Sequence, residues 1–527
     1  MTDIARRSVA VPPKSAAQRG LRTAMAPLHT WAGLLFGWLL FAVFLTGTVS
    51  YFRDEVSLWM KPEIPAAAAV SPEAAAVGAV RYLQETAADA RRWMIDLPTE
   101  RMPATSAIIM RDARHGAPIA RMTLAPATGA PIAARATAGG DFLYYFHYDL
   151  YLPWRLGRYL VCTAAIAMLV AFISGVIVHR RIFKDFFTFR PRKGQRSWLD
   201  AHNALGVLAL PFHVMITYTG LVTLLALYLP WGIDAMYPNG RQDYVAELFD
   251  DTLPRKPANI AGSLTPVEPL LAAAELRWEG GKTGRIVIDN PGDRAATIRL
   301  VRRDSDHISH AVQSMLFDGA TGALLSVSAP IGPAAQARGI FHGLHLARFS
   351  DTGLRWLFFI SGIVGSAMIA TGVLLWAVKR RRHSAHFGHR LVDALNVTAI
   401  IGLPIAIAAF LLCNRLVPAG TSGRITWEIG GFFGAWLATG VHAALRPRHR
   451  AWIEQLVAAS ALFALLPLVN GFTTGRGVWR SLASGDWVFA GIDMTSIAAA
   501  LLLAWSAIYL RRRETTESLS SDEWIPR

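Results

Sequence analysis

The chain has 527 residues, of which 53% are hydrophobic and 17% charged, and a formal net charge of +16 at pH 7. A soluble protein of this length carries nearer a quarter of charged residues, so the composition argues against a soluble globular protein. A positive net charge can indicate nucleic-acid binding, but here arginine and lysine cluster in short stretches between apolar segments, as in membrane-protein loops. We therefore expect a lipid bilayer, and no nucleic acid, as partner.

Eight apolar segments have about the length of 20 residues that crosses a bilayer core of about 30 Å. They cover residues 27–52, 157–178, 203–230, 354–378, 394–413, 427–445, 452–472 and 487–510. We interpret the first as a retained anchor rather than a cleaved signal peptide. Basic stretches fall at alternate ends of these segments, which by the positive-inside rule places both termini in the cytoplasm. The sequence thus predicts a multi-pass protein of a bacterial inner membrane.

These segments divide the chain into predicted parts. They are a cytoplasmic segment 1–26, a first transmembrane helix 27–52, an extracytoplasmic domain 53–145, a second helix with its lead-in 146–178, a cytoplasmic loop 179–200, a third helix 201–230, a second extracytoplasmic domain 231–340, a fourth helix with its lead-in 341–378, a cytoplasmic loop 379–393, a four-helix extension 394–510 and a cytoplasmic tail 511–527.

The two long insertions share one predicted order of elements. In the first, a helical stretch at 72–91 precedes β-prone runs at 93–97, 106–111 and 119–124. In the second, a helix at 266–277 precedes runs at 284–289, 296–301 and 311–317. Each ends on a turn signature closing in Thr-Gly, at 124–129 and 317–322. We expect two small mixed α/β domains.

The helices that flank these insertions are duplicated as well. His29, Gly33 and Thr46-Gly47 recur as His202, Gly206 and Thr219-Gly220, at an offset of 173 residues. Arg158 and Gly175 recur as Arg355 and Gly372 at an offset of 197, with His147 and His345 displaced by one residue. Two such units pack naturally about a pseudo-twofold axis. The predicted fold is an all-α polytopic membrane protein with about eight spans, a duplicated four-helix core and the two small α/β domains.

The duplication gives the histidines a chemical meaning. His29 and His202 would lie at the cytoplasmic entrances of their helices, and His147 and His345 at the extracytoplasmic entrances. A haem iron needs two axial ligands from opposite faces, and facing helices of a bundle can supply them. A single interfacial histidine is more often a hydrogen-bonded helix-end residue, but two symmetry-related pairs favour function. The hypothesis is one haem b near each membrane face, two in all.

The two cysteines, Cys162 and Cys413, lie inside apolar runs and outside any CxxCH or CxxC pattern. The sequence therefore offers no basis for covalently attached haem, an iron–sulfur cluster or thiol redox chemistry. Any redox centre in this chain must be held by histidine.

Other side chains leave alternatives open. His213 lies mid-helix without a partner at its depth, so it is a third-site ligand, a replacement ligand or, as we favour, a buried histidine bonded to a carbonyl. His179 or His342 could replace a member of a pair. The Thr-Gly pairs, Thr371-Gly372 included, together with Gly33 and Gly206, would allow close approach of helices or of a macrocycle, or serve packing alone. Four arginines could pair with haem propionates or anchor the membrane interface, namely Arg155, Arg158, Arg348 and Arg355. For the remaining histidines we expect a solvated role, namely His383, His386, His389, His115, His307 and His310.

At these residues the chain resembles the PepSY-associated transmembrane family of iron-regulated inner-membrane proteins. The matching features are the repeated His-to-Thr-Gly spacing, the histidines that precede Arg158 and Arg355, and the two domains that end in Thr-Gly, over about residues 20–382. Members include di-haem reductases of ferric siderophores. The resemblance therefore implies PepSY-like domains, His29, His202, His147 and His345 as ligands of two b haems, and reduction of a ferric siderophore or other ferric chelate.

The electron donor and the last four helices lie outside this resemblance. Residues 394–510 are not part of the family's four-helix minimum, and no GxGxxG loop follows a strand. We therefore expect a separate donor, either quinol or a cytoplasmic flavoprotein. The alternative hypotheses are a non-enzymatic transporter, which would have broken helices and charged residues at mid-depth, and a sensory or inhibitory module in iron uptake, which would leave the paired histidines unexplained.

Overall fold

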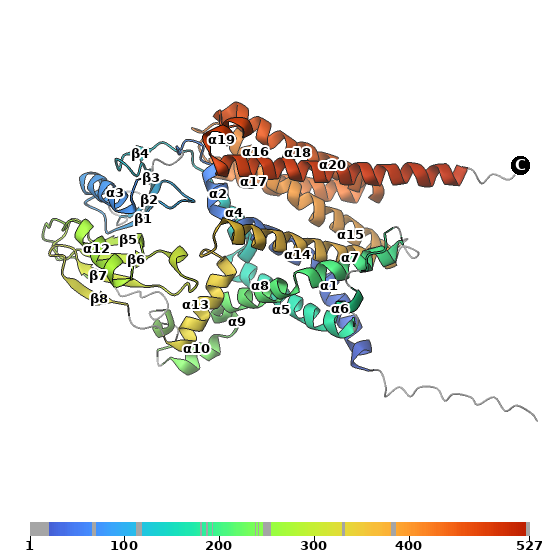
Figure 1. The fold of residues 1–527 in the computed structure, drawn as a ribbon, viewed down its shortest axis with the longest axis horizontal. Helices are drawn as coiled ribbons and strands as arrows, with labels where there is room; N and C mark the ends of the chain where they lie inside the picture. The colour runs from blue at the N-terminus through green and yellow to red at the C-terminus, as the bar shows by residue number, and fades with distance from the viewer. Residues whose placement is uncertain are drawn as a thin grey trace, which may run out of the picture.

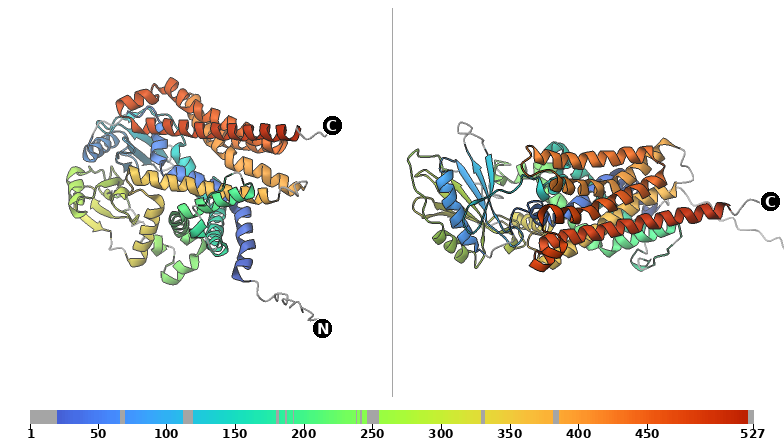
Figure 2. Two further views of the ribbon diagram at one scale, coloured as in Figure 1. Left: turned by 45° about the vertical axis from the view of Figure 1, so that its right-hand side comes forward. Right: turned by 90° about the horizontal axis from the view of Figure 1, so that it is seen from above.

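The computed structural model describes residues 20–65, 70–111, 119–179, 182–185, 188–191, 193–237, 239–240, 242–245, 255–328, 332–380 and 386–522. Long helices run side by side, and a β-sheet with its two helices lies at one end of them (Figures 1 and 2). We call this the sheet end. The opposite end is where α1 (Leu21–Ser50) and α7 (Gln195–Leu208) begin and α14 (Thr352–Lys379) ends. We call it the basic end, because Arg22, Lys193, Arg196 and Lys379 are at or next to these helix ends in the sequence.

Six helices among the described residues are long and apolar enough to cross a membrane. They are α1 (Leu21–Ser50), α5 (Trp154–Val178), α14 (Thr352–Lys379), the continuous helix Phe387–Leu416 made of α15 (Phe387–Val397), the π-turn η5 (Thr398–Gly402) and α16 (Leu403–Leu416), α18 (Arg448–Thr474) and α20 (Trp487–Asp522). The predicted sixth segment forms α17 (Arg424–Leu445), which is not one of them. The chain is a multi-pass membrane protein.

The third predicted span differs from a single straight helix. It is broken into α7 (Gln195–Leu208) and α8 (Leu210–Thr223), which meet at 68°, and counting the pair as one span gives seven. Pro211, at the start of α8, cannot donate a backbone hydrogen bond, and its ring clashes with the preceding turn. Two short helices, α9 (Leu225–Tyr228) and α10 (Pro230–Met236), follow. The continuous span expected at 203–230 was therefore wrong.

The first two repeats pack as equivalent halves of one core. α1 lies against α5 and α14, while α7 lies against α14 and α8 against α5, so these contacts of one repeat recur in the other. The predicted lead-ins are separate helices at the sheet end, α4 (Gly139–Asp149) against α1 and α13 (Pro333–Leu346) against α8. Left-handed residues end both, at Leu150 with φ 58° and Ala347 with φ 51°. This is the arrangement expected of two repeats about a pseudo-twofold axis.

The two insertions form one sheet instead of two separate small domains. Its eight antiparallel strands have the order β4-β3-β2-β1-β5-β6-β7-β8. Their bounds are β1 Arg92–Asp96, β2 Thr105–Met110, β3 Ile119–Leu124, β4 Pro131–Ile132, β5 Thr283–Asp289, β6 Thr297–Arg302, β7 Ser314–Asp318 and β8 Leu324–Val327. β1 pairs with β5, and Met94 lies opposite Val287 at the centre of that pair. Joining the halves removes two unpaired strand edges.

One helix from each insertion covers the same core of this sheet. α3 (Pro72–Thr86) begins at Ser71, whose hydroxyl accepts from the amide of Ala74 at 3.2 Å. α12 (Glu268–Arg277) is its counterpart. The core comprises Leu83 and Leu271 from these helices and the strand residues Trp93, Ile95, Ile286 and Ile288. Because only one face of the sheet is buried in this core, buried hydrophobic and more exposed residues alternate along the strands.

The C-terminal helices attach to the first repeat through buried polar groups. The contact is made by α2 (Arg53–Trp59) and the residue after it, on one side, and α16 on the other. The guanidinium of Arg415 lies 3.7 Å from the Trp59 ring centroid, and Asn414 donates to the carbonyl of Met60 at 3.1 Å. Glu428 on α17 accepts from Thr137 at 2.7 Å. A short helix, α19 (Val478–Ser484), precedes α20. The extension therefore packs on the α2 and α4 side of the core (Figure 1).

Candidate functional site

The predicted histidine pair at the sheet end is brought together by α4 and α13. The ring centroids of His147 and His345 are 6.0 Å apart, with an angle of 26° between the ring planes. Nδ1 of His147 lies 2.8 Å from the carbonyl of Val43, to which it can only donate. Nδ1 of His345 lies 3.1 Å from the hydroxyl of Thr219, which itself donates to a carbonyl and so accepts from the imidazole. In each ring Nε2 remains as the free lone pair.

The second predicted pair lies toward the basic end. The centroids of His29 on α1 and His202 on α7 are 6.3 Å apart, with an angle of 65° between the rings. Nδ1 of His29 donates to the carbonyl of Ala171 and Nδ1 of His202 to that of Met368, both at 2.9 Å. The tautomer is thus the same as at the sheet end. His29 and Gly47 are 18 residues apart on α1, or about 27 Å along the helix axis, so the two pairs are well separated.

All four rings pack against a glycine. A Cβ would lie 2.6 Å from the His147 ring at Gly47, 2.9 Å from His345 at Gly220, 3.1 Å from His29 at Gly175 and 3.1 Å from His202 at Gly372. Each glycine follows a hydroxyl residue, namely Thr46, Thr219, Ser174 and Thr371. These glycines therefore admit an imidazole rather than a helix backbone. Ser174-Gly175 was not predicted to belong with the Thr-Gly pairs. Its offset of 197 residues from Thr371-Gly372, the same as that between Arg158 and Arg355, could have identified it.

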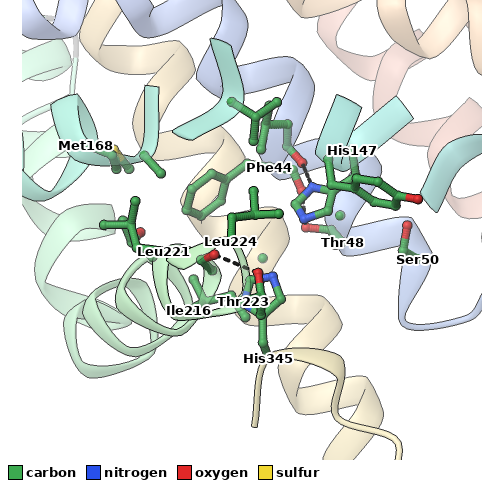
Figure 3. A pocket seen from close by; sticks show the side chains of 18 of the residues that line it. Phe44, Thr48, Ser50, His147, Met168, Ile216, Leu221, Thr223, Leu224 and His345 are labelled. Atoms are coloured by element: carbon green, nitrogen blue, oxygen red, sulfur yellow. Dashed lines mark hydrogen bonds between the residues drawn. The ribbon is translucent and has the colours of Figure 1, made fainter. Parts of the chain in front are cut away.

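A cavity of about 330 Å³ adjoins the sheet-end pair. Both His147 and His345 line it, from different helices, together with Phe44, Met168 and Leu224 (Figure 3). Its volume falls in the range of about 300–1,000 Å³ typical of ligand pockets. The largely apolar lining with a few convergent polar groups suits an aromatic ligand that two imidazoles hold.

Of the four predicted arginines, one lines this cavity and three do not. Arg158 lines it, and its buried Nε has no hydrogen-bond partner, while its guanidinium lies 5.0 Å from the Tyr148 ring centroid. Arg355 instead pairs with Glu55 at 3.0 Å, and Arg348 with Asp304 at 2.6 Å. Arg155 lies over the ring of Trp154. Only Arg158 is therefore placed to meet a charged group of a ligand in the cavity.

His213 is fully buried between the two pairs. Its ring lies 6.0 Å from that of Phe172 and 6.3 Å from that of Phe44. The ring faces the carbonyls of Ser361 and Gly206, but neither nitrogen makes a hydrogen bond of good geometry. No second imidazole among the described residues pairs with it across the core, so His213 has the surroundings of a packed aromatic residue.

The remaining predicted histidines fall in several places. His342 lines the cavity, and its ring centroid lies 4.5 Å from that of His310 in the sheet unit. His179 ends α5, four residues beyond Gly175. His386 and His389 lie 6.4 Å apart at the start of α15, centroid to centroid. His307 is half-buried and both of its ring nitrogens are buried, so the solvated role expected of it was wrong. His115 and His383 lie outside the described residues. Over the described part of the chain, no three histidine, cysteine or acidic side chains gather to hold a metal ion.

The geometry of the pairs allows a test of fit for haem. A metal–imidazole bond of about 2.0–2.1 Å, plus about 1.2 Å from ring nitrogen to centroid, puts two axial imidazoles of one iron about 6.4 Å apart, centroid to centroid. The separations of 6.0 Å and 6.3 Å match this value. With Nδ1 engaged, glycines behind the rings and a cavity beside them, the residues at the sheet-end pair fit the group. The basic-end pair has the same spacing and hydrogen bonding.

This chain is similar to one family model and to other known proteins. The family model described as PepSY-associated TM region matches residues 26–379, which include both histidine pairs. An uncharacterized protein of Pseudomonas aeruginosa is 27% identical over 380 residues, covering 69% of this chain and 94% of that relative. A stretch of 108 residues is 32% identical to a probable quinate permease of Aspergillus terreus, covering 19% of this chain and 18% of the permease. The chain belongs to the PepSY-associated transmembrane family, as its repeated histidine motifs predicted.

Proposed function

We propose that this protein carries electrons across the bacterial inner membrane through two b haems and reduces a ferric siderophore or another ferric chelate at its sheet end. The observation that supports this most is the spacing of the two histidine pairs, 6.0 Å and 6.3 Å, with Nδ1 of every ring engaged. Such hydrogen bonds orient an imidazole and raise its basicity toward a metal. His147 with His345, and His29 with His202, are the proposed ligands of the two irons.

Bound haem would supply reversible one-electron chemistry at each end of the core. The chain itself orients the ligands through four carbonyl or hydroxyl acceptors and leaves space for each ring at a glycine. Arg158 would neutralise a propionate, because its Nε is buried without another partner. Apolar side chains such as Phe44 and Leu224 exclude water from the cavity and so help to set the potential.

The orientation proposed follows the positive-inside rule. The basic end would face the cytoplasm with both termini, and the sheet end the periplasm, where ferric chelates arrive. The donor would be quinol or a cytoplasmic flavoprotein, since the sequence has no glycine-rich dinucleotide loop. Reduction would release iron because hard oxygen ligands hold Fe(III) more tightly than Fe(II).

A direct test uses the purified protein in proteoliposomes with a reductant sealed at the basic end and ferric citrate at the sheet end. The wild type should produce Fe(II) outside the vesicles, trapped by a ferrous-specific dye. His147→Ala and His345→Ala should abolish this and lose one haem each, while His386→Ala, at an exposed helix start, should retain both. Fe(II) production by the two cavity variants at the wild-type rate would refute the proposal.

A transport role is the second candidate, because the break between α7 and α8 is the feature that a transporter predicts. The match to a stretch of a permease points the same way, although it covers only 18% of that protein. Uptake of a labelled chelate by vesicles that contain haem-free protein would favour this second function. Reduction without uptake would exclude it.

A further inference from the structure

The two flanks of the cavity are not equivalent, although the repeats are. The C-terminal extension covers the α4 flank: Phe142 lies 4.9 Å from Phe410 and Phe146 lies 5.2 Å from Phe432, centroid to centroid. On the α13 flank the neighbour is instead a loop of the sheet unit that follows the 3-10 turn Asp304–Asp306. A ligand that approaches the cavity from the sheet end therefore meets different chemistry on its two sides.

This loop is fitted closely to α13. The amide of His310 donates to the carbonyl of Gly339 at 2.9 Å, and a Cβ at Gly339 would come within 3.1 Å of Ala311. Gly343 is packed against the backbone of Ile308 in the same way. The two glycines thereby bring the His310 ring to 4.5 Å from that of His342 on α13.

Asp304 fixes the other side of this contact. Its carboxylate lies 3.4 Å from Nδ1 of His310 and 2.6 Å from the guanidinium of Arg348. Burial opposes the ionisation of Asp304, but the hydrogen bond and charge of His310 and the ion pair with Arg348 outweigh it and lower its pKa. The positive charge of Arg348 is therefore already balanced by a carboxylate.

Arg338, His342 and His345 follow one another along one face of α13, four and three residues apart. His342 and His345 both line the cavity. Arg338 has a buried Nε without a hydrogen-bond partner, and no carboxylate of the described residues forms an ion pair with it; its guanidinium lies 6.0 Å from the Tyr244 ring centroid. Burial and the positive potential of His310 and Arg338 lower the pKa of His342 to about 2. His342 is therefore a neutral imidazole, and the cation available to an anion beside it is Arg338, whose buried Nε has no hydrogen-bond partner among the described residues.

We propose that Arg338, His342 and His310 form the docking site for an anionic, oxygen-ligated ferric chelate, an inference that rests on the proposed reductase function. Arg338 would donate to the carboxylate or catecholate oxygens of the chelate, and His342 would add an N–H donor. Nδ1 of His310 already faces Asp304, so His310 would donate to the chelate from Nε2, in its imidazolium form. A chelate held there would lie on the same face of α13 as His345, the proposed haem ligand. On the α4 flank, rings of the extension pack against Phe142 and Phe146 instead.

The test uses Ga(III) citrate, an anionic chelate that cannot be reduced under these conditions, so binding is measured apart from electron transfer. Full-length protein in nanodiscs is titrated by calorimetry. The wild type should bind saturably, and more weakly as salt rises. Arg338→Gln and His310→Gln should raise Kd by about tenfold or more, as expected for loss of a charge-assisted hydrogen bond. Arg338→Lys should restore part of the affinity.

A matched control is Arg277→Gln, which removes an exposed arginine of α12 elsewhere on the sheet unit and should bind as the wild type does. Equal weakening by Arg277→Gln would show a diffuse charge effect and overturn the site, as would unchanged binding in Arg338→Gln and His310→Gln. Absorption spectra of the same samples separate the two hypotheses. Normal haem without gallium citrate binding refutes docking alone, whereas binding without haem refutes the electron-transfer function alone.

Discussion

A single missing Cβ decides whether each imidazole can reach its place. At Gly47 and Gly220 the added atom would lie 2.6 Å and 2.9 Å from a histidine ring, closer than real Cβ contacts come. Gly33 and Gly206 were also predicted to allow a close approach. Gly33 has nothing within 4 Å of its Cβ position, and Gly206 only meets Met368 at 3.5 Å. The Thr-Gly glycines therefore have a role that Gly33 and Gly206 do not share.

We expect Gly220→Val to lose the sheet-end haem selectively, because the valine side chain would displace His345 from Thr219. The haem-to-protein ratio should fall to about half, read from the pyridine haemochrome spectrum. Gly33→Val, in open space on α1, should keep the full ratio. A full complement of haem in Gly220→Val would mean that His345 binds no iron.

Asp318 offers a test of the Thr-Gly turn through pH. The amide of Thr321, at 3.0 Å, and then the guanidinium of Arg255, at 2.8 Å, lower its pKa to about 2. A carboxyl depressed on folding contributes stability above its unfolded pKa of about 3.9, and this contribution is lost as pH falls toward the folded value. Wild-type Tm should therefore drop between about pH 4 and 2.

In Asp318→Asn the Tm at pH 7 should be lower and the drop in that window smaller, as measured by differential scanning fluorimetry. Asp89→Asn, whose side chain is 57% exposed, should follow the wild-type profile. A wild-type slope in Asp318→Asn would show that this carboxylate does not stabilise the turn.

The histidine pairs could be predicted from spacing, because each repeat carries the same motif at a fixed offset. The arginine partners could not. Arg355 pairs with Glu55, 300 residues away on α2, a short helix that no hydrophobic pattern distinguishes. Likewise His310 looked like a surface residue, since its contact with His342 depends on a loop packing against Gly339 and Gly343.

At the level of elements, the strands were predictable from alternation and their assembly was not. The alternation of buried and more exposed residues in β1 and β5 gives each strand one buried face, but it does not specify which strand pairs with it on either side. The pairing of β1 with β5 joins segments about 190 residues apart and turns two expected domains into one sheet. The break between α7 and α8 had a visible signal in Pro211, which the apolar run masked.

If the sheet is one cooperative unit, damage to its first half should loosen the second. Ile95→Ala on β1 removes a fully buried side chain, and we expect a cost of about 2–5 kcal/mol. Hydrogen exchange should then accelerate in β5 as well as in β1. Ile119→Ala on β3, where the side chain is 53% exposed, should cost within about 0.5 kcal/mol. Protection of β5 that survives Ile95→Ala would show two independent domains.

The whole molecule combines two equivalent repeats with an extension that breaks their symmetry. The repeats place one histidine pair near each end of the core, and the extension closes the α4 flank of the cavity. The multi-pass membrane character and the family were predictable from the sequence, but the number of spans was not. The covering of one flank was not predictable either, because it depends on buried partners such as Glu428 and Thr137 that lie 291 residues apart.

The central claim is that each histidine pair holds one iron, and haem stoichiometry combined with electron paramagnetic resonance tests it most directly. The purified full-length protein should contain two haems b per chain and give two low-spin ferric signals typical of bis-imidazole ligation, of which His29→Ala removes one and His345→Ala the other. A colourless protein, or one whose haem content is unchanged by both substitutions, would contradict the account.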